Sequence, residues 1–225
     1  MLLYYITDRR AFPGTHAEQR SALLRRIAEA ADAGVDYIQL REKDLATREL
    51  EKLAREAVRA VRDNSSVTRL LINSRTDVAL ACGADGVHLP GDDLAASEVR
   101  TLWMKSSDRP PLIGVSAHSI GDVRLAYSHG ANFAVLAPIF EKVQTAAGGI
   151  GLDVLRDACS EVQESNASYT SFSILALGGV NLENAEACLA AGASGLAGVR
   201  LFQTGSVQET VRRLRAMMLA SPRAT

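Results

Sequence analysis

Cysteine is scarce in this chain, and its placement argues against two kinds of cross-linked framework. Three cysteines occur among 225 residues, at Cys82, Cys159 and Cys188. Their number is odd and no two have Cys-x-x-Cys spacing, so neither a set of disulfides nor a zinc site is indicated. We therefore expect a protein of a reducing compartment, the cytoplasm.

Excess charge and long apolar runs are also missing. The 25 basic and 26 acidic residues leave a formal net charge of -1, so we expect no nucleic-acid partner and no attraction to a membrane surface. No apolar run approaches bilayer length, and the N-terminal segment reaches a charge at Asp8, too early for a signal peptide. Any anion site must therefore be local.

No Ser-, Gly- or Pro-rich linker divides the sequence. Hydrophobic residues make up 47% of the chain, which is enough to bury a large core. We therefore predict one domain over residues 1–225, with a frayed tail at 221–225.

Short apolar runs alternate with longer stretches of helical period, the pattern of βαβ units and a parallel sheet. Among the helical stretches are 17–33 and 207–219. Eight such units predict an α/β fold, a single (β/α)₈ TIM barrel. The predicted strands are Leu2–Thr7, Tyr37–Leu40, Arg69–Ile72, Gly86–Leu89, Leu112–Ser116, Phe133–Ala137, Ser173–Leu177 and Gly195–Val199.

A glycine recurs where a helix joins the next strand. Four segments share this pattern, and in each we expect the glycine to take the left-handed conformation that ends a helix, followed by a residue that starts the turn into the sheet. The segments are 33–36, 82–85, 129–132 and 191–194.

In this fold the active site is built from the loops that follow the strands. After the second predicted strand, Gln39, Arg41 and Lys43 alternate along the chain and would turn to one side. Two cations beside an amide suit a diphosphate. A solvated charged loop is an equally good interpretation of these charges.

Other strand ends carry further candidates. Asp92 and Asp93 follow the fourth strand and could hold Mg²⁺, or could cap a helix that we expect to begin near Leu94, an alternative slightly favoured for Asp92. After the fifth strand, Ser116 and His118 are candidates for chemistry. Ser119, spaced from Asp122 like a capping box, is expected to be structural.

Glycine-rich turns follow the last two strands. Gly178 and Gly179 come after the seventh strand and Gly198 ends the eighth, and each turn leads into a predicted helix. Glycine lets the backbone approach an anion closely, and a helix N-terminus supplies free N–H groups. This pair of loops predicts a phosphate site.

Six segments, taken in order, resemble the motifs of the thiamine phosphate synthase family, and the resemblance runs through nearly the whole chain. Thiazole tautomerases of the TenI type share the fold and many of these motifs. The segments are Gln39-Leu40-Arg41-Glu42-Lys43-Asp44, Leu71-Ile72-Asn73, Gly83-Ala84-Asp85-Gly86-Val87-His88-Leu89, Gly114-Val115-Ser116-Ala117-His118-Ser119, Ala137-Pro138-Ile139-Phe140 and Ala176-Leu177-Gly178-Gly179-Val180.

The resemblance implies a reaction. In the synthases a hydroxymethylpyrimidine diphosphate loses pyrophosphate, and the nitrogen of a thiazole phosphate captures the resulting cation to give thiamine phosphate. It also implies roles for residues, carried over by position. Gln39, Arg41 and Lys43 would hold the pyrimidine diphosphate, with Asn73 beside the ring; Asp93 would bind Mg²⁺; Ser116 would contact the pyrophosphate; Gly178 and the loop at Gly198 would hold the thiazole's phosphate.

The chain departs from the family's pattern at two positions. Ser74 stands where the synthases usually have an Asp that also binds Mg²⁺, and Thr145 stands where they have a Lys that meets the pyrophosphate. Lys142 and Asp92 are candidates to compensate. Three functions follow: a synthase, a TenI-like tautomerase with His118 as proton shuttle, or a non-catalytic barrel that binds phosphorylated ligands. A homodimer is a further expectation, because dimers are common in families of this kind.

Overall fold

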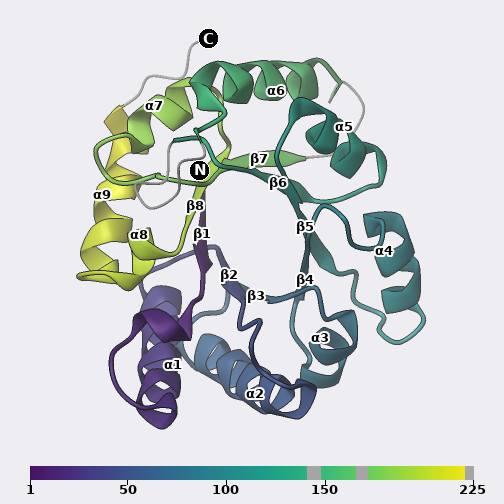
Figure 1. Ribbon diagram of the computed structural model, residues 1–225, viewed down its shortest axis with the longest axis vertical. Coiled ribbons are helices and arrows are strands. Elements are labelled where there is room, and N and C mark those ends of the chain that lie inside the picture. The colour runs from purple at the N-terminus through teal and green to yellow at the C-terminus, as the bar shows by residue number, and fades with distance from the viewer. Residues whose placement is uncertain (141–147, 166–171, 221–225) are drawn as a thin grey trace.

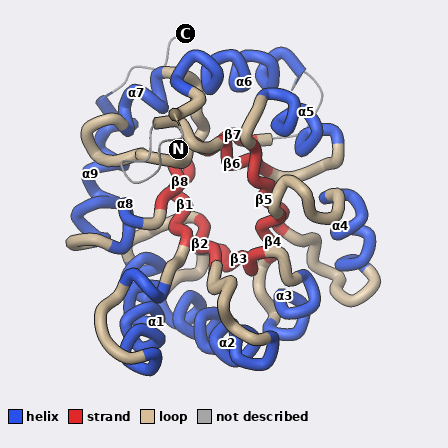
Figure 2. Tube along the Cα trace, in the orientation of Figure 1, coloured by secondary structure: helices blue, strands red, loops and turns tan. Residues whose placement is uncertain are grey.

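A closed barrel of eight parallel strands lies inside a ring of helices (Figures 1 and 2). The computed structural model describes residues 1–140, 148–165 and 172–220, so the predicted frayed tail lies outside the described residues. The strands pair in sequence order and β1 closes the barrel against β8, which confirms the predicted (β/α)₈ fold. They are β1 Leu2–Ile6, β2 Tyr37–Leu40, β3 Arg69–Asn73, β4 Gly86–Leu89, β5 Leu112–Ala117, β6 Phe133–Leu136, β7 Ser173–Ala176 and β8 Gly195–Gly198.

The predicted strands match the observed ones to within one residue at each end. Helices follow the strands and pack on the outside of the barrel. In the described parts of the chain, no helix is long and apolar enough to cross a membrane. The helical segments are η1 Arg9–Ala11, α1 His16–Asp32, α2 Thr47–Asn64, α3 Thr76–Cys82, α4 Ala96–Met104, α5 Ile120–Ser128, α6 Gly151–Ser165, α7 Ala185–Ala190, α8 Arg200–Gln203 and α9 Val207–Ala220.

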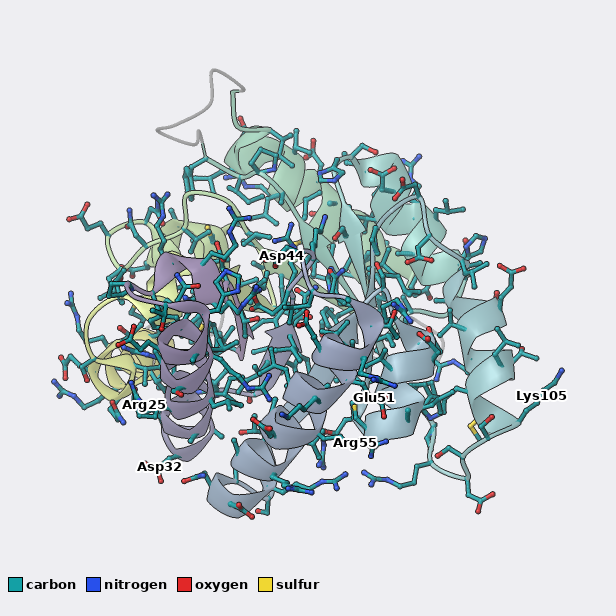
Figure 3. All side chains as sticks on the ribbon, turned by 60° about the horizontal axis from the view of Figure 1, so that its bottom comes forward. Arg25, Asp32, Asp44, Glu51, Arg55 and Lys105 are labelled. Atoms are coloured by element: carbon teal, nitrogen blue, oxygen red, sulfur yellow. The ribbon has the colours of Figure 1, made fainter. Side chains whose placement is uncertain are left out.

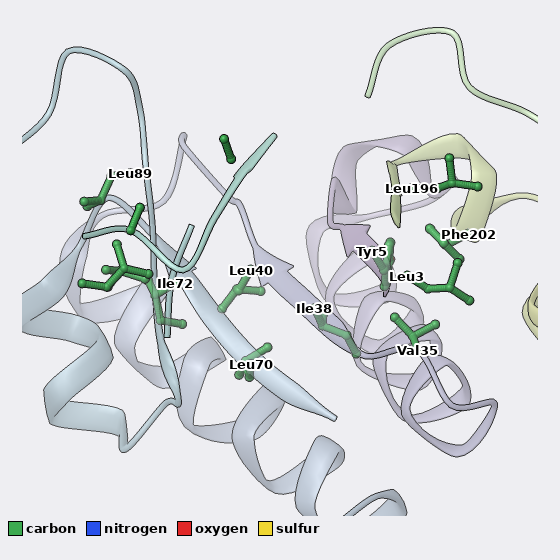
Figure 4. Close-up of a cluster of buried hydrophobic side chains, with 14 of the residues drawn as sticks. Leu3, Tyr5, Val35, Ile38, Leu40, Leu70, Ile72, Leu89, Leu196 and Phe202 are labelled. Atoms are coloured by element: carbon green, nitrogen blue, oxygen red, sulfur yellow. The ribbon is translucent and has the colours of Figure 1, made fainter. Parts of the chain in front are cut away.

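Alternation along each strand divides the core into two parts. In β1, Leu3 and Tyr5 face the helices, where Tyr5 meets Phe202 of α8 (Figure 4). Tyr4 points into the barrel and packs edge-on against Phe133, with ring centroids 5.3 Å apart. All five side chains are fully buried or nearly so, so the barrel interior is a packed core and leaves the chemistry to its mouth.

Each of the four predicted glycine turns has the expected conformation. The glycines have positive φ angles of 85° at Gly34, 69° at Gly83, 74° at Gly130 and 97° at Gly192. A glycine without a Cβ adopts this left-handed backbone readily, and it ends the helix before each even-numbered strand.

The residue after these turns does more than start a strand. In three of the four turns its side chain accepts an N–H from the odd-numbered strand before it, while its own N–H donates to the carbonyl of that same strand residue. The side-chain bonds are Leu3 N–H to Asp36 (2.7 Å), Leu70 N–H to Asp85 (2.9 Å) and Ile113 N–H to Asn132 (2.8 Å). At the fourth position, Ser194, the backbone N–H donates to the carbonyl of Ile174, but the side chain has no such bond among the described residues. The repeat therefore fixes the entry edge of the barrel.

This two-point bond predicts a difference between two equivalent positions. Asn132→Ala should lower the free energy of unfolding by about 1–3 kcal/mol, because it leaves the N–H of Ile113 without its acceptor. Ser194→Ala should change it by no more than about 0.5 kcal/mol. Urea unfolding of both variants measures the difference, and equal losses would contradict the assigned role of the Asn132 side chain.

Candidate active site at the C-terminal mouth of the barrel

The C-terminal ends of all eight strands lie at one mouth of the barrel. Every strand pair is parallel and the sheet is closed, so the C-terminal ends of the strands form a single rim. The predicted site residues on β2, β3, β5 and β8 and in the loops after the strands therefore share this rim, apart from those in undescribed segments. Figure 3 shows Asp44, in the loop after β2, well away from Asp32 and Lys105 at the far ends of α1 and α4.

Gln39 and Asn73 lie side by side on neighbouring strands. The amide of Gln39, which is 1% exposed, donates from Nε2 to Oδ1 of Asn73 over 2.8 Å. The bond holds the two carboxamides together at the mouth, and within the described parts of the chain no donor reaches the Gln39 oxygen, which can accept from a ligand. Such a pair can read the donor and acceptor edge of a heteroaromatic ring.

The two predicted cations follow Gln39 at the end of β2. Arg41 is half-buried, and its backbone N–H donates to the hydroxyl of Thr7 over 3.0 Å. Lys43 is exposed in a turn that Leu45 N–H closes onto the carbonyl of Glu42 at 3.3 Å. Both side chains are thus available to an anion at the rim.

A chain of hydrogen bonds lies just below the rim. His88, in β4, is buried, with Nδ1 at 3.1 Å from the hydroxyl of Tyr4 and Nε2 at 2.9 Å from Oγ of Ser116. Among the described residues His88 is the only partner of the Tyr4 hydroxyl, so that hydroxyl donates its proton to Nδ1. His88 then donates from Nε2 to Ser116, whose own proton is left for a ligand at the mouth.

Burial keeps the hydrogen-bonded groups below the rim uncharged. Burial, together with the smaller effect of the positive charge of Arg41, lowers the pKa of His88 to about 3. Burial also raises the pKa of Tyr4 well above its ordinary value. The imidazole and the phenol are therefore both neutral at physiological pH, and the positive charge at this point of the rim comes from Arg41.

His118 lies beyond the end of β5 and is exposed. Its Nδ1 is 2.8 Å from the carbonyl of Ala137, so this nitrogen carries the proton and donates it. The predicted capping box is half correct. The Ser119 hydroxyl accepts from the backbone N–H of Asp122 at 3.1 Å, but the Asp122 carboxylate accepts from the backbone N–H of His118 and not from that of Ser119. The loop thereby fixes the orientation of the His118 ring.

The two glycine turns line one cavity of about 1140 Å³. Gly178, Gly179 and Gly198 all contribute to its wall, together with Asp8 and Arg213. The predicted phosphate-binding turns are thus brought together, at the ends of β7 and β8.

The backbone in these turns is open to an anion. Gly178 and Gly179 have φ angles of 94° and 66°. The N–H groups of Gly179 and Val180, and that of Arg200 at the start of α8, donate to no acceptor among the described residues. A Cβ at Gly178 would lie 2.6 Å from Cα of Pro138. Only glycine fits this position, and the unpaired donors suit a phosphate.

The acidic candidates after β4 are exposed. Neither caps the next helix, which begins at Ala96 and not near Leu94. Ala95 is the N-cap and its N–H donates to Glu98 at 3.0 Å, while Asp93 accepts from Leu94 N–H at 2.8 Å. The capping alternative for Asp92 is therefore wrong, because the loop is two residues longer than expected.

The two positions at which the chain departs from the family's pattern are Ser74 and Thr145. Thr145, like Lys142, lies outside the described residues. Ser74 follows β3 with φ 60°, a left-handed conformation that serine adopts at a cost, and its N–H donates to the carbonyl of His88.

Within residues 1–140, 148–165 and 172–220, no group of three or more His, Cys, Asp or Glu side chains could hold a metal ion.

Four residues of this site were not predicted from the sequence. His88 and Tyr4 occupy positions of short strands that face the inside of the barrel. The alternation of side chains along each strand could have indicated that these two polar groups point inward. Arg9 and Glu42 form a buried ion pair of 3.0 Å between the loops after β1 and β2, and nothing in the local sequence pairs residues 33 positions apart.

Comparison with known proteins finds one family along nearly the whole chain. The sequence model described as thiamine monophosphate synthase matches residues 3–202. A thiamine-phosphate synthase from Chloroflexus aurantiacus is 35% identical over 97% of this chain and 96% of its own length. One from Methanospirillum hungatei is 36% identical over 87% of this chain and 86% of its own. The solved structure of a thiamine phosphate pyrophosphorylase from Pyrococcus furiosus is 27% identical and superimposes with a TM-score of 0.76, covering 97% and 96% of the two chains.

The buried imidazole predicts a pH dependence of stability. His88 has a lower pKa in the folded protein than in the unfolded chain, so the unfolded chain binds more protons between pH 6.5 and about 3. Stability should be greatest above pH 6.5 and fall as the pH drops, by about 1.4 kcal/mol per pH unit from this residue. Between pH 7 and pH 5, the free energy of unfolding should therefore fall by about 2 kcal/mol more in the unchanged protein than in His88→Gln. Equal slopes would show that His88 is not held neutral.

Proposed function

The chain belongs to the thiamine monophosphate synthase family, and we propose that it joins hydroxymethylpyrimidine diphosphate and thiazole phosphate to give thiamine phosphate and pyrophosphate. It is a transferase of thiamine biosynthesis. In the reaction the bond from the pyrimidine methylene carbon to the diphosphate oxygen breaks, and a bond from the same carbon to the thiazole nitrogen forms.

One observation carries the proposal. The end of β2, with Arg41 and Lys43, and the glycine cavity at β7 and β8 lie on the same rim of a closed parallel barrel. A reaction that joins two phosphorylated molecules requires two anion sites that face one mouth. The loop after β1 lies between them, since Asp8 lines the cavity and Arg9 contacts the loop after β2.

The diphosphate half of the site has donors and cations where charge develops. Gln39 and Asn73 bind the pyrimidine ring, and Arg41 and Lys43 hold the diphosphate. Ser116 donates its hydroxyl proton to the departing pyrophosphate, since His88 donates to the other side of that oxygen. Stabilising the leaving oxygens is what a dissociative step needs.

The glycine cavity holds the phosphate of the thiazole. Free N–H groups at Gly179, Val180 and Arg200 bind its oxygens. This end of the substrate takes no part in bond making, so its binding serves to place the thiazole nitrogen against the pyrimidine carbon.

The residues present fit a magnesium ion that arrives with the diphosphate. Mg²⁺ in phosphoryl sites is commonly held by one or two carboxylates together with substrate oxygens and water. Asp93 is exposed at the rim, and one of its carboxylate oxygens has no partner among the residues that the structure describes; Asp92 is adjacent. When bound, the ion neutralises charge on the leaving pyrophosphate. Without a second carboxylate at Ser74, the diphosphate supplies most of the ligands.

Of the other two functions, neither is favoured. The two relatives compared above are named as thiamine-phosphate synthases, and the matched family is described by the same activity. We further propose that the protein works in the cytoplasm, as a homodimer, with Lys142 taking the place of the missing lysine at Thr145.

The activity itself is the first test. Purified protein with Mg²⁺, the pyrimidine diphosphate and the thiazole phosphate should form thiamine phosphate, measured by fluorescence after oxidation. Lys43→Ala should lower the rate by about 10²-fold, because a cation on the leaving group is lost. Lys105→Ala, exposed beyond α4, should stay within about twofold. Interconversion of thiazole tautomers without product would establish the tautomerase, and binding alone would establish a non-catalytic barrel.

The thiazole phosphate site can be tested at Gly178. Gly178→Ala should raise the KM for the thiazole phosphate by about tenfold or more, because an added Cβ displaces the turn from Pro138. Gly130→Ala is the matched control: its φ is also positive, at 74°, but a Cβ there meets nothing within 4 Å. If both variants raise this KM equally, backbone strain alone explains the effect and the assigned phosphate turn is wrong.

A further inference from the structure

A buried arginine connects the loop after β1 with the loop after β2. The guanidinium of Arg9, which is 4% exposed, donates from Nη1 to Glu42 at 3.0 Å and to Asp44 at 2.7 Å. Its Nη2 donates to the second oxygen of Asp44, also at 2.7 Å. The contact with Asp44 is thus a bidentate fork, which fixes both the position and the plane of the carboxylate.

Glu42 is bound on every side. Its side chain is 1% exposed. Besides the guanidinium of Arg9, it accepts the hydroxyl proton of Thr7 at 2.7 Å and the backbone N–H of Arg9 at 3.2 Å. Burial raises the pKa of Glu42, and these hydrogen bonds oppose the shift. The carboxylate therefore cannot move without leaving its partners unpaired.

These contacts surround Arg41 and Lys43. Arg41 precedes Glu42, and its N–H is held by the same Thr7 hydroxyl that donates to Glu42. Lys43 stands between Glu42 and Asp44, and Arg9 holds both of those neighbours. The cations at the rim are therefore carried on a segment whose intervening residues are fixed to another loop.

The loop that carries Arg9 is itself anchored on its other side. Gln203, buried at the end of α8, accepts from Asp8 N–H at 3.0 Å and donates to the carbonyl of Asp8 at 2.7 Å. Arg9 thus connects the β2 segment to a rigid part of the barrel wall.

We propose that Arg9, through its fork to Asp44 and its buried pair with Glu42, is a positioning residue that sets Arg41 and Lys43 against the diphosphate. The proposal rests on the proposed function of the same site. Arg9 does not bind the anion itself, because its side chain is buried and its fork is taken up by the two carboxylates. By pairing these carboxylates, it also keeps their negative charge from the anion.

Asp44→Asn separates positioning from simple electrostatics. Removing a carboxylate beside Lys43 would strengthen anion binding if charge alone mattered. If Asp44 positions the segment through Arg9, its loss should instead weaken binding of pyrophosphate, by about threefold to tenfold. The two explanations therefore predict opposite changes in pyrophosphate affinity. Asp44 is 40% exposed, so the variant should fold.

The binding measurement is isothermal titration with pyrophosphate in the presence of Mg²⁺, and the kinetic measurement is KM for each substrate. We expect Asp44→Asn to raise the KM for the pyrimidine diphosphate and to leave the KM for the thiazole phosphate within about twofold. Glu51→Gln, whose exposed pair with Arg55 lies on α2 (Figure 3), is the control and should change neither value. Tighter or unchanged pyrophosphate binding in Asp44→Asn would overturn the proposal.

Arg9 variants give a second measurement. Arg9→Lys keeps the charge but cannot hold both carboxylates with a planar fork, and it should weaken pyrophosphate binding as Asp44→Asn does. Full pyrophosphate affinity in Arg9→Lys would overturn the proposal as well. Failure of the proposed function would look different, since the unchanged protein would then form no thiamine phosphate, whatever the variants bind.

Discussion

Closure of the parallel sheet determines where a ligand can bind to this protein. Because β1 pairs with β8 and all pairings are parallel, every strand ends at the same rim. The interior is filled by side chains such as Tyr4, Phe133 and Leu175, so a ligand cannot enter the barrel. It must lie on the mouth, where loops from distant parts of the chain meet.

The charges at this mouth are arranged to receive anions. The layer beneath it is neutral, since burial keeps His88 and Tyr4 uncharged. The carboxylates nearest the β2 cations are paired with Arg9, and hydrogen bonding to Arg9 lowers the pKa of Asp44 to about 2, so the pair persists through the physiological range. Positive charge from Arg41 and Lys43 and unpaired N–H groups near Gly179 are left facing the ligand.

Much of the fold and part of the candidate site could be predicted from the sequence, because the interactions that determine them are local. Apolar runs of strand length gave all eight strands, and glycines such as Gly34 and Gly83 marked the turns because only a residue without a Cβ adopts that backbone easily. Gln39 and Asn73 were assigned to one substrate by the resemblance to the synthase family, and their strands β2 and β3 are neighbours in the barrel. Interactions across the fold could not be predicted in this way: nothing near Arg9 indicates that it pairs with Glu42. The length of the loop after Asp93 was misjudged because Glu98, three residues past the N-cap, supplies the capping that an Asp was expected to provide.

In the proposed reaction, one mouth of the barrel holds the phosphates of both substrates. A crystal structure with Mg²⁺, pyrophosphate and thiazole phosphate tests it most directly. We expect pyrophosphate against Arg41, Lys43 and Ser116, with the thiazole's phosphate on the backbone of the β7 and β8 turns and its ring directed toward the pyrophosphate. Anions bound on separate faces of the barrel, or an empty glycine cavity at saturating thiazole phosphate, would contradict it.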